Sequence, residues 1–150
     1  MFGITYDTDV SPRVVMDTNV LVAALRSKRG ASFRLLSLVD SGRFDICLSV
    51  PLVIEYEAAL LRSARALGIN RRDVADVLDY LCAVAHRQPI FFLWRPRLRD
   101  PYDDMVLELA VAAGCRYVVT FNTRDFEGSR SFGVHAVRPR EFLDTIGALS

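Results

Sequence analysis

Histidine and cysteine are scarce in this 150-residue chain, which has two of the first and three of the second. The cysteines, Cys47, Cys82 and Cys115, are far apart, lie in apolar segments and form no Cys-x-x-Cys pair. We therefore expect buried free thiols in a reducing compartment, and neither disulfides nor a zinc site. The two histidines, with no Gly-x-Ser-x-Gly segment, also argue against a serine hydrolase triad.

Other absences exclude further classes of protein. The chain has no Gly-x-Gly-x-x-Gly segment and no glycine-rich loop ending in Lys-Ser or Lys-Thr, which argues against dinucleotide and P-loop nucleotide binding. No apolar run approaches the roughly 18–20 residues of a membrane helix. Residues 1–9 have neither the basic nor the apolar stretch of a signal peptide. We therefore expect a cytoplasmic protein.

Lysine is nearly absent too, because the single Lys28 accompanies 18 arginines, and the net charge is only +1. Arginine suits bidentate phosphate contacts, but a GC-rich genome produces the same bias, so total charge does not predict nucleic-acid binding. A hydrophobic fraction of 51% and the chain's length indicate one compact domain. We expect an N-terminal extension over residues 1–12 and the domain over residues 13–150.

From Arg13 onward, short apolar runs alternate with longer helical patterns, which is typical of an α/β fold with a parallel sheet. The expected strands are residues 14–16, 44–48, 90–94, 116–120 and 134–137. The expected helices are residues 20–26, 31–39, 51–62, 71 to just before Pro89, 103–113 and 139–149. Residues 121–128 are expected to form a polar loop or short turn.

Acidic side chains follow the first four expected strands. They are Asp17, then Glu55, then the cluster Asp100, Asp103 and Asp104, and finally Asp125. Because the carboxyl ends of parallel strands lie at one edge, we expect these carboxylates to converge. Converging carboxylates repel one another, and an all-oxygen ligand set favours Mg²⁺ or Mn²⁺. Such ions activate water and stabilise the leaving oxygen of a phosphodiester.

Two of these acids have ordinary structural alternatives near the start of the chain. Asp17 could simply cap the following helix. Thr18 and Asn19 would then turn the chain, and they could also position Asp17 by hydrogen bonding. Glu55 could be a solvent-facing residue of its helix, with Glu57 as its local rival.

The later acids are equally open. Asp104 competes with Asp100 and Asp103, and we expect one of the three to be only a helix cap. Asp125 could be an ordinary loop acid. No single acid indicates a metal site by itself. The interpretation as a metal site depends on the placement of all these acids at the ends of strands.

The order of these motifs resembles PIN-domain ribonucleases. Residues 17–24 resemble their opening motif, and residues 99–110 and 114–120 closely resemble the second half of VapC-like PIN toxins of toxin–antitoxin systems. Residues 139–143 resemble the C-terminal helix of that group. The resemblance implies a three-layer α/β/α sandwich with a central parallel sheet of about five strands. It also implies a metal-dependent endoribonuclease, the toxin of a type II pair, which cleaves single-stranded or structured RNA.

The resemblance also implies a set of site residues. The first three family acids correspond to Asp17, Glu55 and Asp104. Many relatives have Thr-Gly-Asp-x-Asp-Leu where this chain has residues 120–126, so Asn122 replaces an acid and Asp125 would supply the missing charge. These five residues are the expected ligands of Mg²⁺ or Mn²⁺, and the four acids are the expected catalytic residues.

The implied partners are RNA, a cognate antitoxin that blocks the acidic crevice, and a second copy of the chain in a homodimer. Candidate phosphate contacts are Arg62, Arg65, Arg71, Arg72, Arg95, Arg97 and Arg99, for which solvated surface charge is an equal alternative. Candidate base-stacking residues are Tyr56, Tyr102 and Phe121, for which packing is the alternative. Two other functions remain open: a catalytically weak PIN-fold module that binds RNA or protein, and a phosphatase. We rank the phosphatase last, because Asn19 takes the second position of its usual Asp-x-Asp motif.

Overall fold

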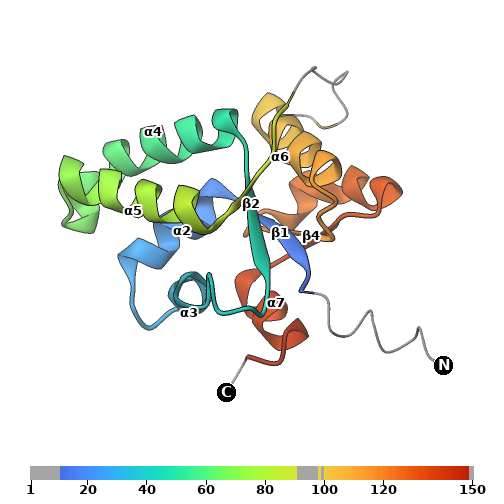
Figure 1. Ribbon diagram of the computed structural model, residues 1–150, viewed down its shortest axis with the longest axis horizontal. Coiled ribbons are helices and arrows are strands. Elements are labelled where there is room, and N and C mark those ends of the chain that lie inside the picture. The colour runs from blue at the N-terminus through green and yellow to red at the C-terminus, as the bar shows by residue number, and fades with distance from the viewer. Residues whose placement is uncertain (1–10, 91–97, 99, 149–150) are drawn as a thin grey trace.

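The computed structural model describes residues 11–90, 98 and 100–148. Its centre is a parallel sheet in the order β3-β2-β1-β4-β5 (Figure 1). The strands are β1 (Arg13–Met16), β2 (Asp45–Leu48), β3 (His86–Arg87), β4 (Tyr117–Val119) and β5 (His135–Val137). The expected five-stranded parallel sheet is therefore confirmed, with β1 at its centre.

Helices cover both faces of this sheet. They are α2 (Thr18–Arg26), α3 (Ala31–Ser37), α4 (Val50–Leu67), α5 (Arg71–Val84), α6 (Pro101–Ala112), the 3-10 helix η2 (Thr123–Phe132) and α7 (Pro139–Thr145). On one side of the sheet, α3 packs against α2 and α7, and α4 packs against α2 and α5. Helix α6 packs against η2 on the opposite side of the sheet (Figure 1). This is the expected sandwich. Among the described residues, no helix is long and apolar enough to cross a membrane.

The burial of β1 explains how the fold presents its first acid. Val14 and Val15 are fully buried and Met16 is nearly so. A strand at the centre of a parallel sheet is covered on both faces, so it needs a continuous apolar run instead of an alternating one. That run holds the strand in the core and leaves Asp17 at its carboxyl end.

Two helix starts follow the sequence closely. The Ser49 hydroxyl accepts a hydrogen bond from the Leu52 N–H at 3.3 Å, and Asn70 forms a reciprocal capping box with Asp73. Helix α4 continues beyond residue 62 to Leu67 and stops at Gly68, which has a left-handed φ of 71°. Glycine adopts this conformation without steric cost, so it sets the end of the helix.

The expected third strand was placed too late in the chain. Strand β3 is His86–Arg87, which pairs with the end of β2, and Ile90 is not in a strand. The remainder of the expected strand lies outside the described residues. The sequence predicts that Pro89 ends a helix, but that helix ends at Val84. Pro89 has no N–H to donate to a sheet, and it lies just beyond β3, outside the ladder of hydrogen bonds.

Smaller corrections concern the ends of elements. Residues 123–132 form η2 where a polar loop or short turn was expected, and Phe126 is buried within it. Helix α6 begins at Pro101, because Asp100 caps it. Helix α7 ends at Thr145, short of the expected residue 149, and Gly147 follows with a left-handed φ of 72°. The three cysteines are free thiols; Cys47 and Cys115 are buried as expected, whereas Cys82 is only half-buried.

Candidate active site

Asp17 lies at the carboxyl end of β1 and is 3% exposed. It occupies the N-cap position of α2, but its side chain makes no capping hydrogen bond. Instead, Oδ1 accepts a hydrogen bond from the Tyr102 hydroxyl and Oδ2 accepts one from the Thr120 hydroxyl, each at 2.6 Å. The carboxylate therefore connects β1 to the start of α6 and the end of β4. This geometry favours a site residue over a helix cap.

Two tyrosines enclose the end of β1. The Tyr102 hydroxyl accepts a hydrogen bond from the Thr18 N–H at 3.0 Å and lies 2.5 Å from the Thr18 hydroxyl. The Tyr56 hydroxyl donates to the Met16 carbonyl oxygen. Burial, and after it nearby negative charge, raises the pKa of both phenols well above the usual value. Both hydroxyls therefore stay protonated as donors. Tyr56 is buried in the core, whereas Tyr102 is half-buried beside Asp17.

Asp103 is a second buried carboxyl group at this edge, with 8% exposure. Its pKa is raised to about 7, first by burial and then by the charges of Asp100, Asp17, Asp125 and Asp104. The shift shows that carboxylates from three different parts of the chain act on one group. Negative charge from these acids therefore disfavours ionisation of Asp103, and the convergence of all the predicted acids, Glu55 included, stays a prediction.

The three acids at the start of α6 have different roles. Asp100 is the N-cap, and its Oδ1 accepts a hydrogen bond from the Tyr102 N–H at 2.8 Å. Asp104, the predicted third acid, accepts a hydrogen bond from the Leu98 N–H at 2.8 Å through Oδ1. Successive side chains on a helix point about 100° apart, so Asp103 and Asp104 cannot face the same way. The structure adds Asp103 to the candidates as the more buried of these two neighbours.

Asn122 and Asp125 lie just beyond β4. The Asn122 N–H donates to the Thr120 hydroxyl at 3.0 Å, and the Asp125 N–H donates to the Asn122 carbonyl at 3.0 Å. The Thr120 hydroxyl thus links this loop to Asp17, because it accepts a hydrogen bond from the Asn122 N–H and donates one to the Asp17 carboxylate. Asn122 and Asp125 are exposed. The charge of Asp125 contributes to the raised pKa of Asp103.

Glu55 occupies the second turn of α4, next to the buried Tyr56. It is half-buried whereas Glu57 is exposed, and its Oε1 lies 3.7 Å from Nη2 of Arg62. The charges that raise the pKa of Asp103 do not include Glu55. Glu55 thus pairs with a basic side chain of its own helix, and its place in the metal site stays a prediction.

Sequence reasoning did not single out Thr120 or assign Tyr102 to the site. Both contact Asp17 from positions 103 and 85 residues away. A polar residue ending the apolar run of β4 was the available signal for Thr120. Asn19, expected to position Asp17, instead has its Oδ1 3.5 Å from the Phe121 N–H.

An acidic cavity of about 790 Å³ opens beside Asp103. Its lining residues are Leu98, Asp100, Pro101, Asp103, Arg124, Asp125, Glu127 and Gly128. The acids outnumber the single arginine, and carboxylate oxygens suit Mg²⁺ or Mn²⁺. As the described side chains are arranged here, no three histidine, cysteine or acidic residues are grouped to hold a metal ion. The chemistry of the donors fits a divalent cation, and the observed arrangement does not fix its ligands.

Comparison with known proteins identifies the family. The model of the PIN domain family matches residues 13–124. The chain belongs to the PIN domain family. The match includes Asp17 and Asn122 and ends one residue before Asp125. PIN domains are generally nucleases that use divalent metal ions, which supports nuclease activity for this PIN domain.

A solved structure shares the fold. This is the crystal structure of VapBC2 from Rickettsia felis bound to a DNA fragment from the VapBC2 promoter. The TM-score is 0.56 and the sequence identity is 13%. The match covers 83% of this chain and 98% of the other chain. At this identity the likeness concerns the fold alone. No curated protein matches the sequence.

Proposed function

We propose that this PIN domain is a metal-dependent endoribonuclease that cleaves phosphodiester bonds in single-stranded or structured RNA. The observation that carries the proposal is a group of acidic side chains at the carboxyl edge of the sheet. Asp17 and Asp103 are buried there, and Asp103 lines a cavity together with Asp100 and Asp125. Such a concentration of negative charge favours a divalent cation, and the carboxylates supply the oxygen ligands that Mg²⁺ and Mn²⁺ prefer.

The residues that would hold the cation are those predicted from the sequence, namely Asp17, Glu55, Asp104, Asp125 and Asn122. Asp103, which is buried at the start of α6, is a further candidate. When bound, the cation would act as a Lewis acid, which would lower the pKa of water and neutralise charge on the phosphodiester. Tyr102 and Thr120 hold the Asp17 carboxylate in one orientation, because each donates to a different oxygen. Neither hydroxyl brings a charge, so the negative field of the site is preserved.

Cleavage of a labelled single-stranded RNA tests this proposal. The purified protein should cut the RNA with Mn²⁺ and stop when EDTA is added. Asp17→Asn should abolish the cut, whereas Asp76→Asn, which changes an exposed acid on α5, should leave it intact. Cleavage by the Asp17→Asn protein at the wild-type rate would refute the proposed mechanism.

We further propose that the chain is the toxin of a type II toxin–antitoxin pair and binds a cognate antitoxin. The structural likeness to VapBC2 and the sequence resemblance support this assignment. Induction in cells should arrest growth and degrade RNA. Asp103→Asn and Asp104→Asn proteins, expressed at the same level, should relieve the arrest if their carboxylates serve the reaction. Continued growth with intact RNA during wild-type expression would contradict a toxin.

A catalytically weak module that binds RNA or protein is the second candidate. Asn122 replaces an acid of the family pattern, and the described residues hold no ready group of three metal ligands. Calorimetry with Mn²⁺ separates the two functions. Absence of heat together with absence of RNA cleavage would favour the binding module.

A homodimer is also proposed, together with a cytoplasmic location. Val50 and Ile54 on α4 are 73% and 62% exposed, and a cavity of about 410 Å³ lies beside them. Apolar side chains exposed together are typical of an interaction surface. Light scattering should give twice the chain mass, and Ile54→Glu should shift it to the mass of one chain.

A further inference from the structure

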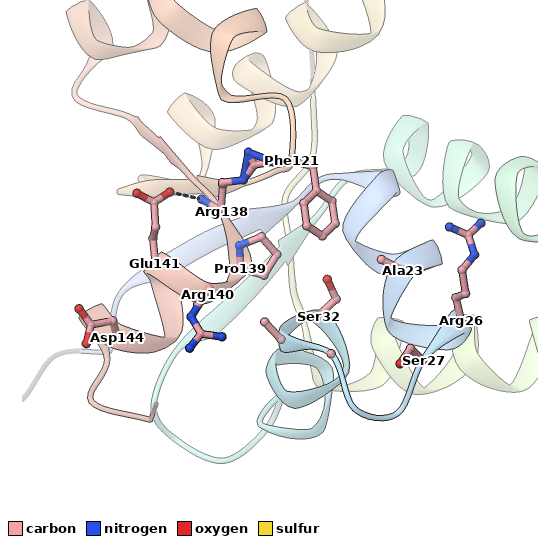
Figure 2. A pocket seen from close by; sticks show the side chains of 12 residues that line it. Ala23, Arg26, Ser27, Ser32, Phe121, Arg138, Pro139, Arg140, Glu141 and Asp144 are labelled. Carbon is pink, nitrogen blue, oxygen red and sulfur yellow. Dashed lines mark hydrogen bonds between the residues drawn. The ribbon is translucent and has the colours of Figure 1, made fainter. Parts of the chain in front are cut away.

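A second cavity, of about 750 Å³, opens between α2, α3 and α7. The residues that matter here are Arg26, Ser32, Phe121, Arg138, Pro139 and Arg140 (Figure 2). Phe121 follows β4 and Arg138 follows β5, so one end of the cavity lies at the carboxyl edge of the sheet. Phe121 also directly follows Thr120, the donor to Asp17. The cavity is therefore a neighbour of the candidate active site and separate from its acidic cavity.

Ser32 gives the cavity an unused hydrogen-bonding group. It is 4% exposed, and its hydroxyl is the one buried side-chain polar atom of the described residues without a hydrogen-bond partner. Figure 2 shows this hydroxyl pointing toward Phe121, between Ala23 and Pro139. A buried polar group without a partner destabilises the fold and calls for an explanation. A ligand that bonds to the hydroxyl supplies one.

The remaining lining combines a flat aromatic face with positive charge. The guanidinium carbon of Arg138 lies 5.9 Å from the centre of the Phe121 ring. Arg26 and Arg140 also line the cavity, and all three arginines are exposed. Two acids, Glu141 and Asp144, also line the cavity, so the three arginines exceed the acids by one charge. Oε1 of Glu141 accepts a hydrogen bond from the Arg138 backbone N–H at 2.9 Å. The cavity thus suits a flat ring joined to an anion.

We propose that this cavity binds one nucleotide of single-stranded RNA next to the bond that is cut. The base lies against Phe121, the phosphate meets Arg138 and Arg140, and a polar edge of the base or sugar bonds to the Ser32 hydroxyl. The inference rests on the proposed ribonuclease function. A cavity of this size is in the range of small-molecule sites, and aromatic stacking with arginine contacts is a common way to hold unpaired bases.

RNA binding without cleavage tests the inference. Fluorescence anisotropy would follow a labelled ten-nucleotide RNA in EDTA, with a gel to show that the RNA stays whole. Phe121→Leu keeps an apolar side chain but removes the stacking face, and it should weaken binding about tenfold. The double variant Arg138→Gln/Arg140→Gln should weaken it at least as much and reduce its dependence on salt. Arg34→Gln, an exposed arginine of α3 outside the cavity, is the matched control and should bind normally.

Ser32→Ala gives a readout that a purely structural role would not produce. Loss of an unsatisfied hydroxyl should leave the melting temperature unchanged or raise it, while RNA affinity falls about threefold to tenfold. Unchanged affinity in this variant, together with unchanged affinity in Phe121→Leu, would overturn the inference. Because cleavage by the wild-type protein is measured separately, that result would leave the ribonuclease proposal standing.

The source of the nucleotide is resolved by a second probe. Calorimetry with uridine monophosphate tests whether a free nucleotide occupies the cavity. If this probe binds and Phe121→Leu abolishes the binding while RNA is neither bound nor cut, then the cavity serves a free nucleotide and the RNA inference fails with the proposed function. If neither probe binds, the nucleotide site itself is wrong.

Discussion

Two buried carboxyl groups share the carboxyl edge of the sheet, and their surroundings differ. Asp17, at the end of β1, accepts hydrogen bonds from two neutral hydroxyls that fix its orientation. Asp103, in the first turn of α6, lies among the charges of four other acids and has its pKa raised to about 7. The surroundings of Asp17 fix the orientation of its carboxylate, whereas those of Asp103 concentrate negative charge. A site that binds a cation needs oriented ligands and also a negative charge that attracts the ion.

The largest expected effect separates Asp103 from its neighbour Asp104. If the buried group is the one that serves the reaction, Asp103→Asn should lower RNA cleavage roughly 1000-fold, because a metal ligand contributes several kcal/mol to the transition state. In that case Asp104→Asn should lower cleavage less, because Asp104 is less buried than Asp103. Rates measured with Mn²⁺ decide the matter. The opposite order would return the third-acid role to Asp104, as the sequence alone predicts.

The hydroxyl support of Asp17 is expected to have the next largest effect. Tyr102→Phe removes a donor to Oδ1 of Asp17 and an acceptor of the Thr18 N–H. Loss of a hydrogen bond to a charged group costs about 1.5–3 kcal/mol of stability, and loss of an outer-shell contact costs about 10–100-fold in activity. Urea unfolding and cleavage rates measure the two effects. Tyr80→Phe, whose hydroxyl donates to Val39 from a more exposed position, is the control.

The dependence of stability on pH sharpens the comparison. The pKa of Asp103, about 7 in the folded chain against an ordinary 3.8, means that the folded state keeps a proton that the unfolded chain releases. The free energy of unfolding should therefore fall as pH rises from about 4 to 7, through this group. In Asp103→Asn that fall is absent, so the variant should be more stable than the wild type at pH 8 and similar near pH 4. Urea unfolding in EDTA tests this, and parallel profiles for the two proteins would refute it.

The smallest effect concerns the ion pair of Glu55. Arg62 is 67% exposed in its side chain, so Arg62→Gln should change stability by less than about 1 kcal/mol. Cleavage should stay near the wild-type rate in this variant. Glu55→Gln should slow cleavage more, if the sequence resemblance assigns Glu55 correctly. Equal rates for both variants would remove Glu55 from the site.

Sequence reasoning succeeded where local pattern decides structure. The strand over residues 14–16 and the helices that begin near residues 51 and 71 were predicted, because each depends on neighbours only a few residues away. It failed at β3, where a short pair of residues carries no pattern and Pro89 fits the end of a helix or of a strand equally well. The choice among adjacent acids in α6 was open for a similar reason, since composition does not say which way each side chain points.

The sequence by itself determined that an apolar strand delivers Asp17 to the edge of a parallel sheet. It also determined that acids follow the other strands. Only the tertiary structure decided that Asp17 meets Tyr102 and Thr120, that Asp103 is buried among the acids, and that Ser32 faces a cavity. The physical reason is range. Periodicity and capping act over one or two turns, whereas these contacts join residues 85 and 103 positions apart and exist only once α6 and β4 pack against β1.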